Sequence, residues 1–192
     1  MTFPSFHDPS HLFFITASLI EWKHLFITQE YALIPLNSLA WMQQQNRILV
    51  FAYVVMPSHL HAILKPVTGT IAEIIQQFGS FTSHGILKKL REQSQKDLLN
   101  IFQQKRRDRR HKHSIWQDIQ AKNIYSLDFL QQKIEYIHQN PVAKDWKLVE
   151  DRADYMYSSA GYYDYGRESA IEITDINEWL TENPSPRTAK RA

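Results

Sequence analysis

An apolar run that carries two histidines constrains the fold of this chain more than any other feature. The run, Phe51-Ala-Tyr-Val-Val-Met-Pro-Ser-His-Leu-His-Ala-Ile-Leu-Lys65, is rich in β-branched and aromatic residues and is interrupted by a single Pro-Ser pair. Such a pattern predicts two adjacent strands, over residues 48–56 and 59–65, joined by a tight turn. Side chains on a strand alternate between its two faces, so His59 and His61 should project from the same face, close enough to share one metal ion.

The composition indicates an ordinary globular domain. With 192 residues, 43% of them hydrophobic, the chain can bury a substantial core, and we expect one domain over residues 1–182 and a flexible basic tail over 183–192. The absence of cysteine excludes disulfides and thiolate metal sites and favours an intracellular compartment. Neither a signal peptide nor a stretch long enough to cross a bilayer is recognisable, so we expect a cytoplasmic protein without membrane contact.

The remaining patterns predict an α+β architecture. We expect strands over residues 12–20 and 115–125, an extension or hairpin over 22–28, and helices over 35–45, 71–93 and 127–140. Gly79 and Gly85 weaken the case for one unbroken helix over 71–93. The order of these elements is typical of an antiparallel sheet covered by helices.

The helix expected over residues 127–140 carries a second group of candidate residues. Ser126 is a suitable N-cap, and the carboxylate of Asp128 in the first turn complements the helix dipole. At about 100° per residue an apolar stripe forms, made by Leu127, Leu130, Ile134 and Ile137. Tyr136 then points to roughly the opposite side, with Asn140 one turn further along beside it. A tyrosine in this position is, taken alone, more often a surface aromatic than a nucleophile.

Positive charge is concentrated in one segment although the formal net charge is only +2. Six basic residues fall within nine positions: Lys105, Arg106, Arg107, Arg109, Arg110 and Lys112. Cationic runs attract the phosphate backbone of nucleic acids, so these six residues are candidate DNA contacts. A solvated loop explains the same run equally well.

The residues by themselves leave the chemistry open. A His-x-His pair on a strand is a metal site or a hydrogen-bonded structural pair. A Gly-rich phosphate loop, zinc spacings with cysteine and a Gly-x-Ser-x-Gly nucleophile motif are all absent. A metal-dependent hydrolase remains possible, in which His59 and His61 act with a carboxylate such as Glu73 or Glu135.

Two motifs resemble those of a known family. Tyr53-Val-Val-Met-Pro-Ser-His-Leu-His61 is similar to the histidine-hydrophobic-histidine motif of the IS200-like Y1 HUH transposases. Glu135-Tyr-Ile-His-Gln-Asn-Pro-Val142 is similar to the tyrosine motif of their REP-associated tyrosine transposase branch. Shorter segments at residues 80–83, 116–117 and 154–159 also resemble that branch, in the same order. The resemblance spans about residues 13–163.

The resemblance implies a fold, a site and a reaction. The fold is a ferredoxin-like sandwich with the histidine motif on a central strand. His59, His61 and Asn140 would ligate a divalent metal, Mg²⁺ or Mn²⁺, and Tyr136 would be the catalytic nucleophile. The enzyme would nick and rejoin single-stranded DNA containing hairpins through a 5′-phosphotyrosine, as a homodimer, in DNA transposition and recombination.

The sequence departs from the branch at two places. Ser58 stands where Asn is common, and residues 143–149 read Ala-Lys-Asp-Trp-Lys-Leu-Val instead of the commoner Arg-Ala-Gly-Leu-Val. Neither change touches a proposed ligand or the nucleophile. A DNA-binding module that keeps the fold but is catalytically idle or adopted by its host is therefore the alternative to the active enzyme.

Overall fold

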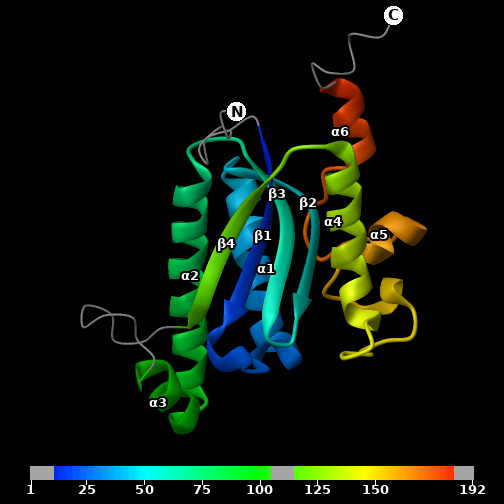
Figure 1. Ribbon diagram of the computed structural model, residues 1–192. Coiled ribbons are helices and arrows are strands. Elements are labelled where there is room, and N and C mark those ends of the chain that lie inside the picture. The colour runs from blue at the N-terminus through cyan, green and yellow to red at the C-terminus, as the bar shows by residue number, and fades with distance from the viewer. Residues whose placement is uncertain (1–10, 105–114, 184–192) are drawn as a thin grey trace, which may run out of the picture.

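The computed structural model describes residues 11–104 and 115–183 and has a four-stranded antiparallel sheet at its centre (Figure 1). The strands are β1 (Leu12–Leu19), β2 (Ile48–Met56), β3 (His59–Pro66) and β4 (Trp116–Ile124). They are arranged in the order β2-β3-β1-β4, so β3 and β1 are the inner strands. This order and the antiparallel pairing confirm the predicted α+β, ferredoxin-like fold class.

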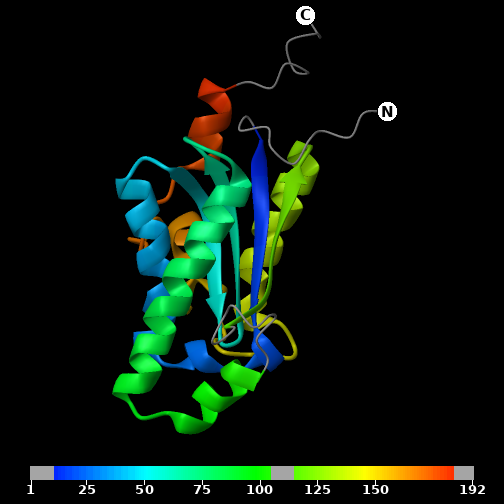
Figure 2. The same cartoon turned by 90° about the vertical axis from the view of Figure 1, so that its left-hand side faces the viewer.

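Helices cover both faces of the sheet. The helices are α1 (Gln29–Gln44), α2 (Ile71–Glu92), α3 (Lys96–Gln104), α4 (Leu127–Gln139), α5 (Ala160–Tyr165) and α6 (Ile176–Glu182). Four short 3₁₀ turns complete the fold: η1 (Ile20–Trp22), η2 (Leu25–Ile27), η3 (Asn140–Val142) and η4 (Arg152–Asp154). Figures 1 and 2 show α1 and α2 on one side of the sheet and α4 on the other. None of the helices in the described ranges is both long and apolar enough to span a membrane.

The strands sort their side chains between two apolar cores. Leu60, Ala62 and Leu64 of β3 join the larger core, beneath α1 and α2. Ile63, between them in the sequence, joins the smaller core beneath α4. Because side chains alternate along a strand, His59 shares the face of Ile63, and the α4 side of the sheet is where the histidines lie.

The segment 22–28 does not form the strand extension or hairpin that we expected. Its backbone turns through η1 and η2, and the amide of Phe26 donates to the carbonyl of Pro57 at 2.9 Å. The chain therefore crosses beneath the β2–β3 turn, whose backbone satisfies its polar groups, and does not pair along the sheet.

Helix α1 begins at Gln29, six residues before the expected start at Pro35. Proline is favoured in the first turn of a helix, which is why it suggested a start. Here Pro35 lies inside the helix and is buried, and one backbone hydrogen bond is lost. Burial of its neighbours, such as Leu36 and Leu39, in the larger core stabilises the helix in spite of that loss.

Helix α2 runs unbroken through Gly79 and Gly85. At both glycines the helix lies close to a neighbouring element. A Cβ atom at Gly79 would lie 3.0 Å from Cδ1 of Ile119 in β4, and one at Gly85 would lie 3.1 Å from Cγ2 of Ile34 in α1. The glycines thus let α2 approach the sheet and α1. Helices α3, α5 and α6 were not predicted, although Asp175 caps α6 through the amides of Asn177 and Glu178.

Candidate active site

His59 and His61 project side by side from β3 toward α4, as the strand alternation predicted. Their ring centroids are 4.9 Å apart, and both side chains are buried, at 5% and 4% exposure. Strand β3 is paired on both sides, with β2 and with β1, so the backbone that carries the two rings is fixed along its length. The imidazoles are therefore preorganised on an inner strand.

A hydroxyl group lies beside the Nδ1 atom of each ring. Thr16 Oγ1 is 3.0 Å from Nδ1 of His61, and Ser58 Oγ is 3.2 Å from Nδ1 of His59. These contacts orient the rings and leave Nε2 of each available to a ligand. Sequence reasoning missed Thr16, which lies directly opposite His61 in the β1–β3 register. Its hydroxyl within the apolar run Leu12–Leu19 was the available signal.

Burial keeps both imidazoles neutral. It lowers the pKa of His59 to about 4, against a smaller rise from a hydrogen bond with Asn140. Burial, together with smaller electrostatic contributions from His59 and Lys133, lowers the pKa of His61 to about 3. A neutral imidazole offers a lone pair to a metal, so at neutral pH neither ring has to lose a proton before it binds one.

Helix α4 places Tyr136 against the histidines. Ser126 caps the helix by accepting a hydrogen bond from the amide of Phe129 at 3.2 Å, as predicted. The hydroxyl of Tyr136 lies 3.4 Å from Nε2 of His61 in the same chain, while the side chain remains 46% exposed. The hydroxyl of this partly exposed tyrosine is thus beside the histidine pair.

The predicted orientation of Tyr136 needs correction. It does not point away from the apolar stripe but lies on its flank, with the ring facing His61 at a centroid distance of 5.1 Å. The contact face of α4 does not coincide with the predicted stripe: Leu127 is 44% exposed, whereas Asn140, on the Tyr136 side of the helix, is buried. Tyr136 therefore lies at the edge of this contact face, against His61.

Asn140 completes the cluster at the end of α4. Its side chain is 8% exposed, and Nδ2 donates to the backbone carbonyl of Tyr136 at 2.7 Å. A hydrogen bond between His59 and the side chain of Asn140 places the amide beside that ring. The cluster therefore brings together all four residues that the sequence singled out, with Tyr136 at His61 and Asn140 at His59.

The donor set fits one divalent cation. Two neutral imidazoles and one amide oxygen leave coordination positions for water and a phosphate oxygen. The imidazoles suit later transition metals such as zinc, whereas the oxygen donors also suit manganese and magnesium. Within residues 11–104 and 115–183, no group of three or more His, Cys, Asp or Glu side chains is arranged to hold a metal. Asn140 is thus the third protein donor that the cluster offers.

The carboxylates of the hydrolase alternative are engaged elsewhere. Glu73 accepts from the amide of Thr70 at 2.8 Å and caps α2, on the opposite face of the sheet. Glu135 accepts from Arg152 at 2.7 Å and from Gln139 at 2.9 Å. Neither Glu73 nor Glu135 is therefore placed to join the histidines as this alternative requires.

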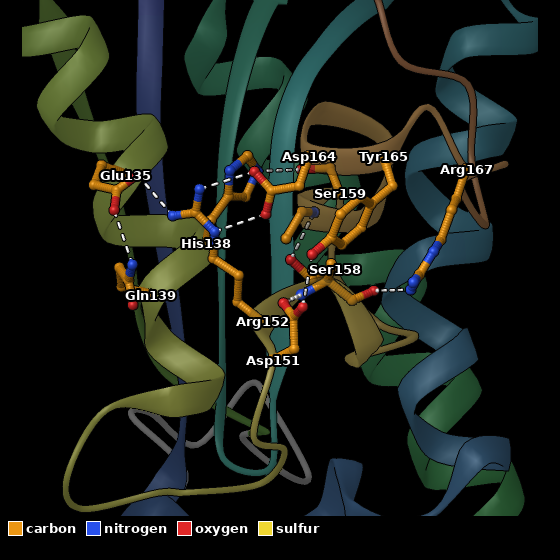
Figure 3. Close-up of polar contacts among 12 residues, drawn as sticks. Glu135, His138, Gln139, Asp151, Arg152, Ser158, Ser159, Asp164, Tyr165 and Arg167 are labelled. Atoms are coloured by element: carbon orange, nitrogen blue, oxygen red, sulfur yellow. Dashed lines mark hydrogen bonds and ion pairs between the residues drawn. The ribbon is translucent and has the colours of Figure 1, made fainter.

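A polar network holds the other flank of α4 (Figure 3). Nε2 of the buried His138 lies 2.9 Å from Oγ of Ser159, and Arg152 bridges Glu135 and Asp164 with contacts of 2.7 Å each. These bonds connect α4 to η4 and α5. They fix the rotation of α4 about its axis and hence the side on which Tyr136 emerges.

Aromatic rings and one cation surround the cluster, and sequence reasoning missed them. Phe14 stacks on His61 with centroids 5.3 Å apart, and Lys133 Nζ lies 5.2 Å from the ring centroid of Tyr136. Trp22 and Trp146 contact His59 at centroid distances of 5.6 and 5.8 Å. No periodic pattern in the sequence links these residues, because each comes from a different element.

The six basic residues proposed as DNA contacts lie outside the described residues: Lys105, Arg106, Arg107, Arg109, Arg110 and Lys112. The chain that follows them is described from Ile115, whose carbonyl accepts from the amide of Ile20 at 3.0 Å. Ile20 is the first residue of η1, which also contains Trp22. Ile115 thus lies beside the turn that contacts the candidate site.

Comparison with known proteins places the fold. No protein-family model and no curated protein matches the sequence. The solved structure of a REP-associated tyrosine transposase bound to a REP hairpin is similar at a TM-score of 0.61 and 17% identity, covering 92% of this chain and 94% of that one. A "putative transposase" from Deinococcus radiodurans R1 gives a TM-score of 0.44 at 14% identity, covering 72% of this chain and 97% of that one. The chain has the fold of the REP-associated tyrosine transposase, whose branch its histidine and tyrosine motifs resemble.

Proposed function

We propose that this protein nicks and rejoins single-stranded DNA in a metal-dependent reaction, with Tyr136 as the nucleophile. The observation that carries the proposal is the position of the Tyr136 hydroxyl, 3.4 Å from Nε2 of His61 at the open side of a preorganised pair of neutral imidazoles. Core packing does not explain the position of Tyr136, because nearly half of its side chain is exposed.

The reaction is a transesterification. The Tyr136 oxygen attacks the scissile phosphorus in line, a bond forms between them, and the bond to the 3′-oxygen of the preceding nucleotide breaks. The proton lost by the phenol is regained at the 3′-oxygen, so neither water nor a nucleotide cofactor is consumed. A divalent cation held by His59, His61 and Asn140 would polarise a non-bridging phosphate oxygen. The 5′-phosphotyrosine keeps the energy of the phosphodiester for rejoining.

The surroundings of the cluster suit a DNA strand. The proposal assigns phosphate contacts to the basic run that begins at Lys105, since the chain following it returns beside η1. A hairpin substrate of the REP type and a homodimer belong to the same proposal. The REP hairpin in the structurally similar transposase supports the choice of that DNA as the first probe.

The test uses a labelled oligonucleotide with a REP-type hairpin and single-stranded flanks, in Mn²⁺ or Mg²⁺, followed by a denaturing protein gel. We expect a covalent protein–DNA band with the unmodified chain and none with Tyr136→Phe. Tyr165→Phe is the matched control, because Tyr165 is also exposed, at 60%, but lies on α5. This control should form the band at the unmodified rate.

The two alternatives give different results in the same experiment. Retarded migration under native conditions without any covalent band would indicate the catalytically idle DNA-binding module. Metal-dependent cleavage that continues in Tyr136→Phe would indicate a hydrolase that uses the histidines without the tyrosine. Either result contradicts the proposal.

A further inference from the structure

Trp22 stands out because its backbone is strained and its side chain contributes to no core. It follows Glu21, and the two consecutive residues have φ angles of 51° and 53°. Positive φ is rare for residues other than glycine and a genuine outlier for a bulky one, because Cβ crowds the backbone. Such strain persists only where the surrounding structure imposes it, and it gathers at functional sites.

The strained turn presents a tryptophan at the candidate active site. Trp22 is 52% exposed and belongs to neither apolar core, so burial does not explain its place. Its ring meets His59 edge to face at a centroid distance of 5.6 Å. Trp146, the other indole at His59, differs because it packs on the smaller core. Trp22 is therefore the indole of this pair with a surface to offer a ligand.

We propose that Trp22 binds an unpaired nucleobase of the DNA strand beside the scissile phosphate. The inference rests on the proposed function and names a contact that positions the substrate. Tyr136 and Trp22 contact His61 and His59, two residues apart on β3, so a strand whose phosphate lies at Tyr136 passes the indole within a nucleotide or two. Aromatic rings stack on any base, which suits a single strand without a fixed sequence.

Base stacking predicts a defined loss of affinity. In the Tyr136→Phe background, where no covalent bond can form, Trp22→Ala should weaken binding of the hairpin oligonucleotide by about 5- to 100-fold. Trp22→Phe should retain most of the affinity, because a phenyl ring still stacks. Trp41→Ala is the matched control: Trp41 is 40% exposed and stacks on Phe81 in the α1–α2 layer, across the sheet from the site, and its loss should leave affinity unchanged.

A second measurement locates the base and separates stacking from support of His59. Abasic nucleotides are placed one at a time along both single-stranded flanks, and affinity is measured by fluorescence anisotropy. One abasic position should weaken the affinity of the chain that retains Trp22. That loss of affinity should disappear in Trp22→Ala, because the two changes remove the same contact. Circular dichroism and Mn²⁺ affinity should be the same in both chains.

The proposal is overturned if Trp22→Ala binds the oligonucleotide as tightly as the chain that retains Trp22. It is equally overturned if every loss of affinity at an abasic position persists in the variant. It is also overturned if the variant loses Mn²⁺ affinity while the abasic penalties remain, because Trp22 would then only support His59. These outcomes do not depend on catalysis. Absence of the covalent band in the unmodified chain refutes the enzyme and leaves the abasic coupling to be read on its own.

Discussion

The two flanks of α4 each pair a histidine with a tyrosine, yet the pairs differ in what their polar atoms contact. On one flank, the Tyr136 hydroxyl faces His61 Nε2 at 3.4 Å and the side chain is nearly half exposed. On the other, His138 lies against Tyr163 with centroids 5.3 Å apart, and the Tyr163 hydroxyl donates to the carbonyl of Phe51 at 2.8 Å. Burial raises the pKa of Tyr163.

The difference separates the pair that we propose to be reactive from a structural one. Nε2 of His138 contacts Ser159 and the Tyr163 hydroxyl donates to a backbone carbonyl, so these polar atoms of the pair already have partners within the fold. In the pair of His61 and Tyr136, the Tyr136 hydroxyl and His61 Nε2 face each other, and the Tyr136 side chain is partly exposed to solvent. Residue type alone therefore does not identify the site, whereas the partners of each polar atom do.

The largest contrast between the flanks should appear in covalent bond formation. Tyr136→Phe should lower the rate of adduct formation by at least about 10⁴-fold, because the nucleophilic oxygen is gone. Tyr163→Phe should keep the rate and lower the free energy of unfolding by about 1 kcal/mol, through the lost hydrogen bond. Gel quantification and urea unfolding measure the two effects. Equal loss of activity in both variants would erase the distinction.

Acidification should lower the free energy of unfolding through the buried histidines on both flanks of α4. Burial lowers the pKa of His138 to about 4, as it lowers those of His59 and His61 to about 4 and 3. Below the unfolded value of about 6.5, the unfolded chain binds protons that the folded chain excludes. Stability is therefore complete above pH 6.5 and falls as the pH drops toward 4, by up to about 1.4 kcal/mol per pH unit for each histidine.

Variants apportion this pH dependence between the flanks. Urea unfolding between pH 7 and pH 5 should show a slope that falls by about one third in His138→Gln and by about two thirds when His59 and His61 are both replaced by Gln, since each histidine contributes equally. A slope that is the same in all chains would show that the buried imidazoles do not control acid stability.

Replacement of His61 and replacement of His138 should have different effects on metal affinity. His61→Ala should weaken Mn²⁺ binding by at least about 100-fold, because it removes one of three protein donors. His138→Ala should bind Mn²⁺ as the unmodified chain does, but unfold about 2–3 kcal/mol more easily, because a cavity forms and Ser159 loses a partner. Isothermal titration and urea unfolding distinguish these results, and weaker Mn²⁺ binding in His138→Ala would place that residue at the site.

The smallest expected effect on metal affinity comes from the Thr16 hydroxyl, which contacts Nδ1 of His61. Thr16→Val preserves the shape of the side chain and removes the contact that orients His61. Mn²⁺ affinity should fall by about 10-fold, the size usual for groups behind a ligand. Ser38→Ala, which removes a buried hydroxyl from α1 on the other side of the sheet, is the control and should leave affinity unchanged. Unaltered affinity in Thr16→Val would show that backbone and packing suffice to place the ring.

The sequence was sufficient for the elements whose local signals agree with the fold. Strand β2 follows from its apolar run and α4 from Ser126 and its stripe. The start of α1 did not follow, because Pro35 is a start signal by local rules and the packing of α1 on the sheet overrides it. The Asp175 cap of α6 was a readable signal that went unused.

For the site, sequence motifs identified the four central side chains but not their surroundings. The turn at Trp22 depends on positive φ angles that no residue there favours, so tertiary contacts must impose it. Thr16 and Lys133 reach the cluster from separate elements, and only the pairing of β1 with β3 and the rotation of α4 bring them together. Such contacts depend on the assembled fold.

The most direct test of the account is to find the atom that becomes bonded to DNA. The protein is incubated with the hairpin oligonucleotide and Mn²⁺, digested with nuclease and protease, and the nucleotide-bearing peptide is sequenced by mass spectrometry. The account predicts a 5′-nucleotide on Tyr136 and on no other tyrosine. A nucleotide on Tyr163 or Tyr125, or strand cleavage that leaves every tyrosine unmodified, would contradict it.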